Sequence, residues 1–172
     1  MLELTTKRFI LRPIQMTDAD ILHHAIFDDP EVMHFGDGIQ TQEWVCAWIA
    51  AQVKQYDERG YGTYAIVEKN DKDVIGYCGL FHYPDVNGQA EVEIGYRLAR
   101  SAWGNGYATE AARAVRDHAL TAFGMQRLIA LIDPSNIASI RVAEKIGMRY
   151  EQEVMFEGYS HPDHVYAIVR SL

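Results

Sequence analysis

The sequence predicts an α/β protein, classed as α+β in some schemes, whose helices pack on one mixed β-sheet. Two features of the apolar pattern predict this fold class. Strand-like segments with alternating or continuous apolar residues recur along the chain, and segments with the period of an amphipathic helix separate them. Their order is strand, helix, helix, three strands, helix, strand, helix and two strands. The 172 residues suit one hydrophobic core, so a single domain over residues 1–172 is expected.

The N-terminal part is expected to contain a strand and two helices. Residues 7–14 alternate in polarity and end near a proline, as strands often do. Thr17 followed by Asp20 resembles a capping box, which predicts the start of a first helix. A second helix is expected over residues 41–60, where apolar residues return with helical spacing until a glycine. Residues 28–40 contain a proline and two glycines and are expected to form a loop or a broken helix.

The rest of the chain carries three strands and then alternates between helix and strand patterns. Residues 128–132 are apolar at every position, which indicates a strand covered on both faces. Residues 107–123 carry small apolar residues on one helical face. The other expected elements are strands over 63–68, 74–82, 91–98 and 165–169, and a helix over 138–146 that ends at Gly147.

Charge and cysteine content argue against several classes of protein. The chain has 16 Lys and Arg against 24 Asp and Glu, and its formal net charge is −8. A nucleic-acid partner is therefore disfavoured, because affinity for phosphate backbones comes from clustered basic residues. No secretory signal and no apolar run long enough to span a bilayer is found, so no membrane partner is expected. Cys46 and Cys78 lie outside any CxxC pair, which fits free thiols in a reducing cytoplasm.

Residues 91–111 are the most informative stretch, with the pattern of a strand, a glycine turn and a helix. Gly104 and Gly106 lack a Cβ, so the chain can turn tightly and a ligand can approach the amides. The N–H groups of residues 105–108 would face outward at the positive end of the helix dipole, where pyrophosphate binds readily. For two glycines alone, a plain strand-to-helix connection is the better explanation. The Gly-Lys-Ser/Thr of a P-loop is missing, and Thr109 stands near the place of a dinucleotide fingerprint's third glycine.

Two motifs carry a resemblance to a known family. Residues 103–111 read Trp-Gly-Asn-Gly-Tyr-Ala-Thr-Glu-Ala, and residues 136–148 read Asn-Ile-Ala-Ser-Ile-Arg-Val-Ala-Glu-Lys-Ile-Gly-Met. Together they resemble the GNAT superfamily of N-acetyltransferases, in particular the branch of the ribosomal-protein N-terminal (alanine/serine) acetyltransferases. The order of elements agrees from residue 7 to 172. Two departures are Met148, where the branch has phenylalanine, and Ser101, where the superfamily often has Gln or Arg.

The resemblance implies a fold, a cosubstrate and a set of binding residues. The fold would be a mostly antiparallel sheet of about seven strands, splayed at its centre, with about four helices. Acetyl-CoA would donate the acetyl group directly to an amine in a ternary complex, and no metal would be needed. The cofactor-binding residues would be Ile94, Tyr96, Leu98, Trp103, Gly104, Asn105, Gly106, Tyr107, Ala108, Asn136 and Ser139.

A carboxylate is the expected base, because a protonated amine must lose a proton before it attacks a thioester. Glu91 and Glu93 alternate with apolar residues and so share one face of their strand. Glu93 is the base candidate, since the resemblance implies a splay of this strand from the next one. Glu91 stays an alternative, and an ordinary solvent-facing edge explains both residues without catalysis. A β-bulge is expected at Gly95, beside the gap.

The proton donor for the leaving thiolate has several candidates. Many superfamily members place a tyrosine seven residues after the motif asparagine, where this chain has Ala143. Ser139, water, Tyr166 or another hydroxyl would then supply the proton. Asn136 also suits a helix N-cap, independently of any cofactor. His161 and His164 are too few to form a metal site, and a loop entering a strand explains them better.

The acceptor is expected to be a cationic amine, the N-terminus of a basic protein. By resemblance its groove would lie between residues 27–40 and 155–163. Alternatives are a small amine such as a polyamine, amino acid or aminoglycoside, or a non-catalytic CoA-binding sensor. Either a monomer or a homodimer fits the sequence. The acidic residues expected at the groove, which would attract a cation, are Asp28, Asp29, Glu31, Asp37, Glu151, Glu153, Glu157 and Asp163.

Overall fold

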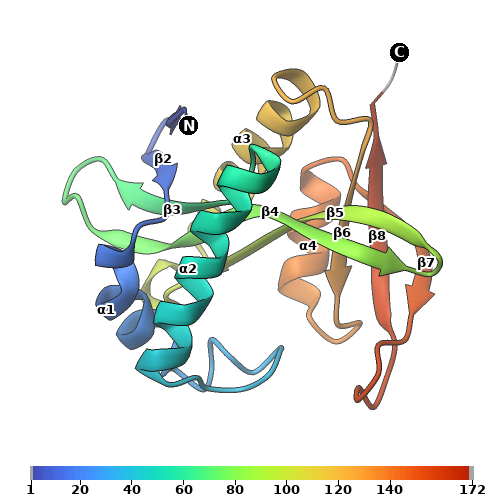
Figure 1. Ribbon diagram of the computed structural model, residues 1–172, viewed down its shortest axis with the longest axis horizontal. Coiled ribbons are helices and arrows are strands. Elements are labelled where there is room, and N and C mark those ends of the chain that lie inside the picture. Colours follow the sequence, from blue (N-terminus) through green and yellow to red (C-terminus); the bar gives the residue numbers. More distant parts are fainter. Residues whose placement is uncertain (1, 171–172) are drawn as a thin grey trace.

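The computed structural model describes residues 2–170, which form one eight-stranded sheet and four α-helices (Figure 1). Short 3-10 or π turns precede or follow α1 and precede α3. The helices are α1 (Ala19–Leu22), α2 (Gln42–Arg59), α3 (Tyr107–Thr121) and α4 (Ile137–Lys145). The strands are β1 (Leu4–Thr5), β2 (Phe9–Pro13), β3 (Thr63–Glu68), β4 (Val74–Val86), β5 (Gln89–Leu98), β6 (Arg127–Ile132), β7 (Arg149–Val154) and β8 (Asp163–Val169).

The sheet has the order β1-β2-β3-β4-β5-β6-β8-β7, and every pair of neighbours is antiparallel except β5 and β6. The two central strands run parallel and are joined at a single pair, Glu93 with Ile129. A long hairpin of β4 and β5 reaches from the first half of the sheet across to the second half (Figure 1). The sheet therefore has a weak seam at its centre, as a splayed sheet requires.

Helices cover the two faces of the sheet through separate cores. Tyr77 and Cys78 are neighbours in β4, and their side chains point to opposite faces. Tyr77 belongs to the core completed by α1 and α2, whereas Cys78 lies in the larger core beneath α3 and α4. The expectation that Cys78 is a core residue is confirmed, since its side chain is fully buried. None of the helices in residues 2–170 has both the length and the apolar character needed to cross a membrane.

The predicted fold class is confirmed, and the central elements lie close to their expected bounds. β1 is an additional strand of two residues that pairs with β2. The first helix is broken into a 3-10 turn, one α-helical turn and a π-helix. The capping box expected at Thr17 is wrong: the Asp18 carboxylate accepts the main-chain N–H of Gln15 at 2.8 Å, while Asp20 binds the Gln42 side chain at 2.6 Å.

The bulge expected at Gly95 is also wrong. Gly95 pairs in register with Gly79 of β4, and the irregularity of this hairpin lies between Tyr83 and Val86. A Cβ on Gly95 would come within 2.9 Å of the Phe81 ring. The glycine is thus explained by close packing of an aromatic ring on the strand, not by a change of register.

Candidate active site

The seam between β5 and β6 opens directly after Glu93. Beyond the pair formed by Glu93 and Ile129, β5 and β6 share no further bridge. The main-chain N–H of Leu131 instead donates to the Glu93 side chain, with 3.2 Å between Leu131 N and Glu93 Oε1. A carboxylate thus takes the place of a main-chain carbonyl, and the two strands diverge towards the C-terminal end of β5.

The surroundings of Glu93 favour its protonated form. Burial is the main cause that raises the pKa of this carboxyl to about 7, and the charge of Asp163 raises it further. Hydrogen bonds from the Leu131 N–H and the Tyr83 hydroxyl, and the charge of Arg97, act in the opposite direction. A carboxylate with a pKa near neutrality can accept a proton and release it again at physiological pH.

Glu91 lies two residues away on the same face but has different partners. Its side chain is 5% exposed, so the expectation of a solvent-facing edge is wrong for this residue. Oε1 of Glu91 accepts from the Arg127 guanidinium at 2.9 Å and from the Gln89 amide at 2.5 Å. Arg127 also binds Glu151 of β7 through two hydrogen bonds, at 2.8 and 2.9 Å. Glu91 is therefore part of a structural ion-pair network that joins β5, β6 and β7.

The glycine turn has the geometry of an open cradle. Gly104 and Gly106 adopt φ values of 77° and 73°, in the left-handed region that favours glycine. A Cβ at Gly104 would meet nothing within 4 Å, and one at Gly106 would meet only an Arg8 nitrogen at 3.9 Å. Within residues 2–170, the N–H groups of Gly106 to Ala108 have no hydrogen-bond acceptor, as expected for the first turn of α3. Free amides at the positive end of a 15-residue helix suit an anionic ligand such as pyrophosphate.

Two side chains, those of Trp103 and Arg8, hold the glycine turn in place. The indole of Trp103 donates to the Leu98 carbonyl at 2.9 Å, which ties the turn to the end of β5. Arg8, just before β2, donates from Nη1 to the Asn105 carbonyl at 2.9 Å and pairs with Glu110 of α3 at 2.7 Å. Sequence reasoning missed Arg8, because no local pattern links it to a turn about a hundred residues later.

The start of α4 faces β5 across the core. Asn136 caps this helix: its side-chain oxygen accepts the Ser139 N–H at 3.1 Å. The Tyr96 hydroxyl donates to the Ser139 carbonyl at 3.2 Å, so β5 and the first turn of α4 are in contact. Tyr166 is buried in the large core, which also contains Ala143, and burial is the main cause that raises the pKa of its phenol.

The two segments expected to border the acceptor groove do come together. The Tyr159 hydroxyl donates to Asp37 Oδ1 at 3.2 Å, which joins the loop after α1 to the loop before β8. Arg97 of β5 donates to the Phe35 carbonyl at 2.7 Å and holds the same loop against the strand. Glu93, Arg97 and these loops therefore lie on the face of the sheet opposite to α3 and α4.

The acidic residues expected at this groove are only partly assembled there. Asp29 pairs with Arg100 at 3.2 Å, and Glu151 is bound by Arg127 as described above. Their charges are thus compensated elsewhere, which corrects the expectation for these two residues. Asp163 and Asp37 remain near the site: the charge of Asp163 acts on Glu93, and both act on Tyr159.

No group of three or more His, Cys, Asp or Glu residues in the described part of the chain is arranged to hold a metal ion. His161 lies 3.2 Å from Asp133, and His164 lies 3.7 Å from Glu153. These two histidines thus face different carboxylates and do not share a site.

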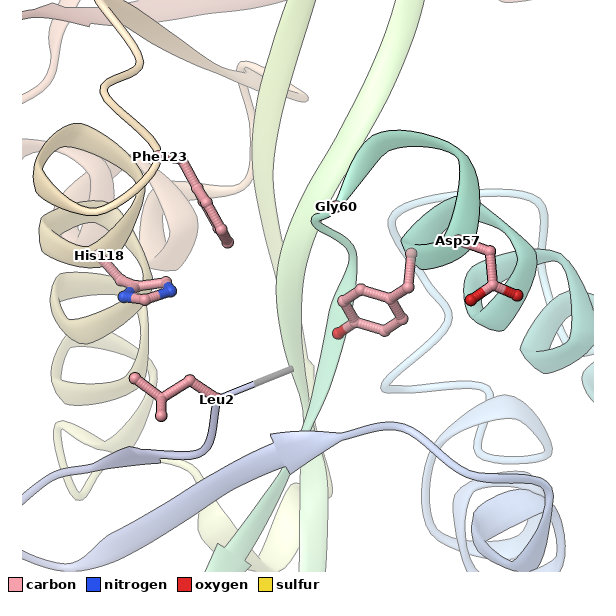
Figure 2. A pocket seen from close by; sticks show the side chains of 6 residues that line it. Leu2, Asp57, Gly60, His118 and Phe123 are labelled. Carbon is pink, nitrogen blue, oxygen red and sulfur yellow. The ribbon is translucent and has the colours of Figure 1, made fainter.

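A separate cavity of about 360 Å³ lies between the C-terminal ends of α2 and α3 (Figure 2). His118, on its wall, is about 16 Å along α3 from Tyr107 by the helical rise per residue. The cavity is therefore remote from the glycine turn. Its lining residues are Leu2, Tyr56, Asp57, Gly60, His118 and Phe123.

Comparisons with known proteins agree with this geometry. A family described as "Acetyltransferase (GNAT) domain" matches residues 8–149. The protein YkkB of Bacillus subtilis is 41% identical over 158 residues, which cover 88% of each chain. An acetyltransferase from Agrobacterium tumefaciens superposes with a TM-score of 0.84 at 27% identity, covering 99% of this chain and 95% of that one. The ribosomal-protein α-N-acetyltransferase RimL, solved in complex with coenzyme A, shares the fold at a TM-score of 0.80 with 18% identity, covering 98% of each chain.

Proposed function

The chain belongs to the GNAT family of acetyltransferases, and on that premise we propose that it acetylates the N-terminal amine of a protein or peptide. Transfer of an acetyl group from acetyl-CoA to an amine is the chemistry of the family. The acceptor and the residue roles given below are our proposal. The observation that carries it is the position of Glu93: a carboxylate with a pKa of about 7 stands where β5 and β6 separate.

The glycine turn is our proposed cofactor site. Its residues fit the group, since the free N–H groups at the start of α3 and the space left by Gly104 and Gly106 suit a pyrophosphate. The bound cofactor supplies an activated acetyl thioester. Beyond Glu93, the main-chain groups of β5 lack partners on β6 and are available to hold an extended arm and to polarise a carbonyl.

Glu93 is our proposed general base. Its ionised form can accept a proton from an ammonium group, directly or through water, and burial strengthens that tendency. Glu91 is less suited to the role, because Arg127 and Gln89 already occupy its carboxylate. The Tyr83 hydroxyl is near enough to Glu93 to influence the pKa of its carboxyl, and would orient it towards the opening.

Ser139 is our proposed proton donor for the leaving thiolate. It lies in the first turn of α4, and the contact from Tyr96 keeps that turn against β5. Asn136 uses its oxygen as the helix cap, so its amide N–H groups stay available to the cofactor arm. Ala143 is buried and has no hydroxyl, so it cannot supply the proton.

An acceptor panel with a thiol-release readout tests the function. Purified protein would be given acetyl-CoA with basic, neutral and acidic peptides carrying free N-termini, and with polyamines, amino acids and aminoglycosides. We expect the largest kcat/KM for basic peptides and the loss of activity when the peptide N-terminus is blocked. Turnover of small amines alone would point to a small-molecule acetyltransferase. Binding of acetyl-CoA without turnover of any amine would point to a sensor.

Charge at the groove gives a further prediction. Replacing Asp37 or Asp163 with Asn should raise KM for a basic peptide by roughly two- to fivefold at low salt, because each carboxylate attracts the cationic acceptor. The difference should shrink at high ionic strength, where such attraction is screened. Asp71→Asn, in the exposed turn between β3 and β4, removes the same charge far from the groove and serves as the control. Equal effects of all three variants, or none that depends on salt, would contradict a role for the groove charge.

A further inference from the structure

Arg8 makes several contacts with the glycine turn and the start of α3. Its main-chain N–H donates to Glu110 Oε1 at 2.8 Å, and its Nε donates to Glu110 Oε2 at 2.7 Å. Its Nη1 donates to the Asn105 carbonyl at 2.9 Å. The guanidinium carbon lies 4.4 Å from the centre of the Tyr107 ring. One side chain thus contacts the residue before Gly106, the residue after it and the next turn of the helix.

The contact with Asn105 determines the direction of an N–H group. In a trans peptide the C=O and the following N–H point to opposite sides, and none of the described peptide bonds is cis. Because Arg8 holds the Asn105 C=O on its own side, the Gly106 N–H must point to the other side. This N–H is one of those without an acceptor in residues 2–170.

The turn would otherwise be free to rotate. Both of its glycines adopt positive φ, and glycine populates other backbone conformations at little cost. Among the described residues, the Asn105 side chain bonds only to carbonyl groups of the turn itself, those of Ala102 and Trp103. Arg8 connects the turn to β2 instead, where Phe9 is fully buried and packs edge-on against Tyr107 at 4.8 Å. The sheet therefore serves as a rigid support for the peptide between Asn105 and Gly106.

We propose that Arg8 is a positioning residue that aims the Gly106 N–H at the pyrophosphate of coenzyme A by holding the Asn105 carbonyl from behind. The inference rests on the proposed cofactor role of the glycine turn. Arg8 contributes through geometry and not through charge, since the neighbouring carboxylate of Glu110 compensates the charge of its guanidinium. Arg8 itself need not touch the cofactor.

Binding of three probes by calorimetry tests this role. Coenzyme A carries the pyrophosphate and a 3′-phosphate, dephospho-coenzyme A keeps only the pyrophosphate, and pantetheine has neither. For Arg8→Gln we expect Kd to rise about tenfold or more for both coenzyme A and dephospho-coenzyme A, the size expected for loss of a charge-assisted hydrogen bond. Kd for pantetheine should change less than about twofold. Arg8→Lys keeps the charge but cannot bridge Glu110 and Asn105, and it should show an intermediate loss.

Arg59→Gln is the matched control, because it removes the charge of an exposed arginine at the end of α2, on the other face of the sheet from α3, and should leave all three affinities unchanged. A loss seen with coenzyme A but not with its dephospho form would mean that Arg8 contacts the 3′-phosphate, and would overturn the proposal. An equal loss for all three probes would reveal a general structural defect, and no loss at all would also overturn it. Failure of the wild-type protein to bind coenzyme A would instead refute the proposed cofactor site, so the two failures are distinguishable.

Discussion

Glu93→Gln is expected to lower kcat/KM for amine acetylation by about 10²–10⁴-fold, the usual contribution of a positioned general base. Glutamine keeps the shape of the side chain and can still accept the Leu131 N–H, but it cannot take up a proton. The affinity for acetyl-CoA should therefore change little. Steady-state kinetics with the best acceptor, together with calorimetric cofactor binding, measure both quantities.

The pH dependence of kcat/KM in the wild-type enzyme provides an independent test of the proposed role of Glu93. Since its pKa is raised to about 7, the Glu93 carboxyl is protonated below that pH and ionised above it. We expect kcat/KM to rise with pH through about 7 and this step to be missing in Glu93→Gln.

The contribution of Glu93 to the stability of the fold should fall with rising pH, whereas kcat/KM rises. A carboxyl whose pKa is higher in the folded than in the unfolded protein stabilises the fold below its unfolded pKa and loses that contribution as pH rises through 7. Glu93→Gln should therefore melt at the same or a higher temperature than wild type at pH 8. A low activity caused by unfolding would show a lower melting temperature instead.

Glu91→Gln is the matched control for Glu93. It removes a carboxylate from the same face of β5, but one that is bound to Arg127. We expect a loss of stability with near-normal turnover, because the partly buried guanidinium of Arg127 loses part of its compensation. Loss of turnover confined to Glu91→Gln would transfer the role of base to that residue. Full activity in both variants would leave another group or a water chain as the base.

Gly106→Val is expected to abolish the increase in melting temperature that acetyl-CoA gives the wild-type protein. A ligand present at a hundred times its Kd stabilises the folded state by about 2.7 kcal/mol, which a thermal shift detects easily. A valine side chain would occupy the open space in front of the turn and would strain a backbone with φ of 73°. Differential scanning fluorimetry over a range of acetyl-CoA concentrations measures the effect.

Gly88→Val is the control that distinguishes loss of the cofactor site from the general effect of backbone strain. Gly88 lies in the β4–β5 turn, has φ of 90°, and an added Cβ there would also meet nothing within 4 Å. Its substitution should reduce stability in a similar way but leave the acetyl-CoA shift intact. A folded Gly106→Val protein with an unchanged shift would contradict the assignment of the turn.

The sequence by itself determined the fold class and most of the element order. β3 has the expected bounds of 63–68, and α3 begins at the expected Tyr107. Both follow from local geometry, because the period of apolar residues reports which backbone conformation lets one face be buried. The first helix was less predictable, since its 3-10 and π turns depend on packing against α2 and β4. The glycine turn was recognisable from the sequence because the residues that adopt positive φ, Gly104 and Gly106, lie two positions apart.

Only the tertiary structure decided how residues of the same type differ in their surroundings. Glu91 and Glu93 are indistinguishable by alternation, yet Arg127 neutralises one and the opening beside Leu131 isolates the other. Arg8 reaches Glu110 across 102 positions of sequence. Ion pairs, burial and pKa depend on what a neighbouring strand or helix brings within a few ångströms, and local periodicity carries no information about that neighbour.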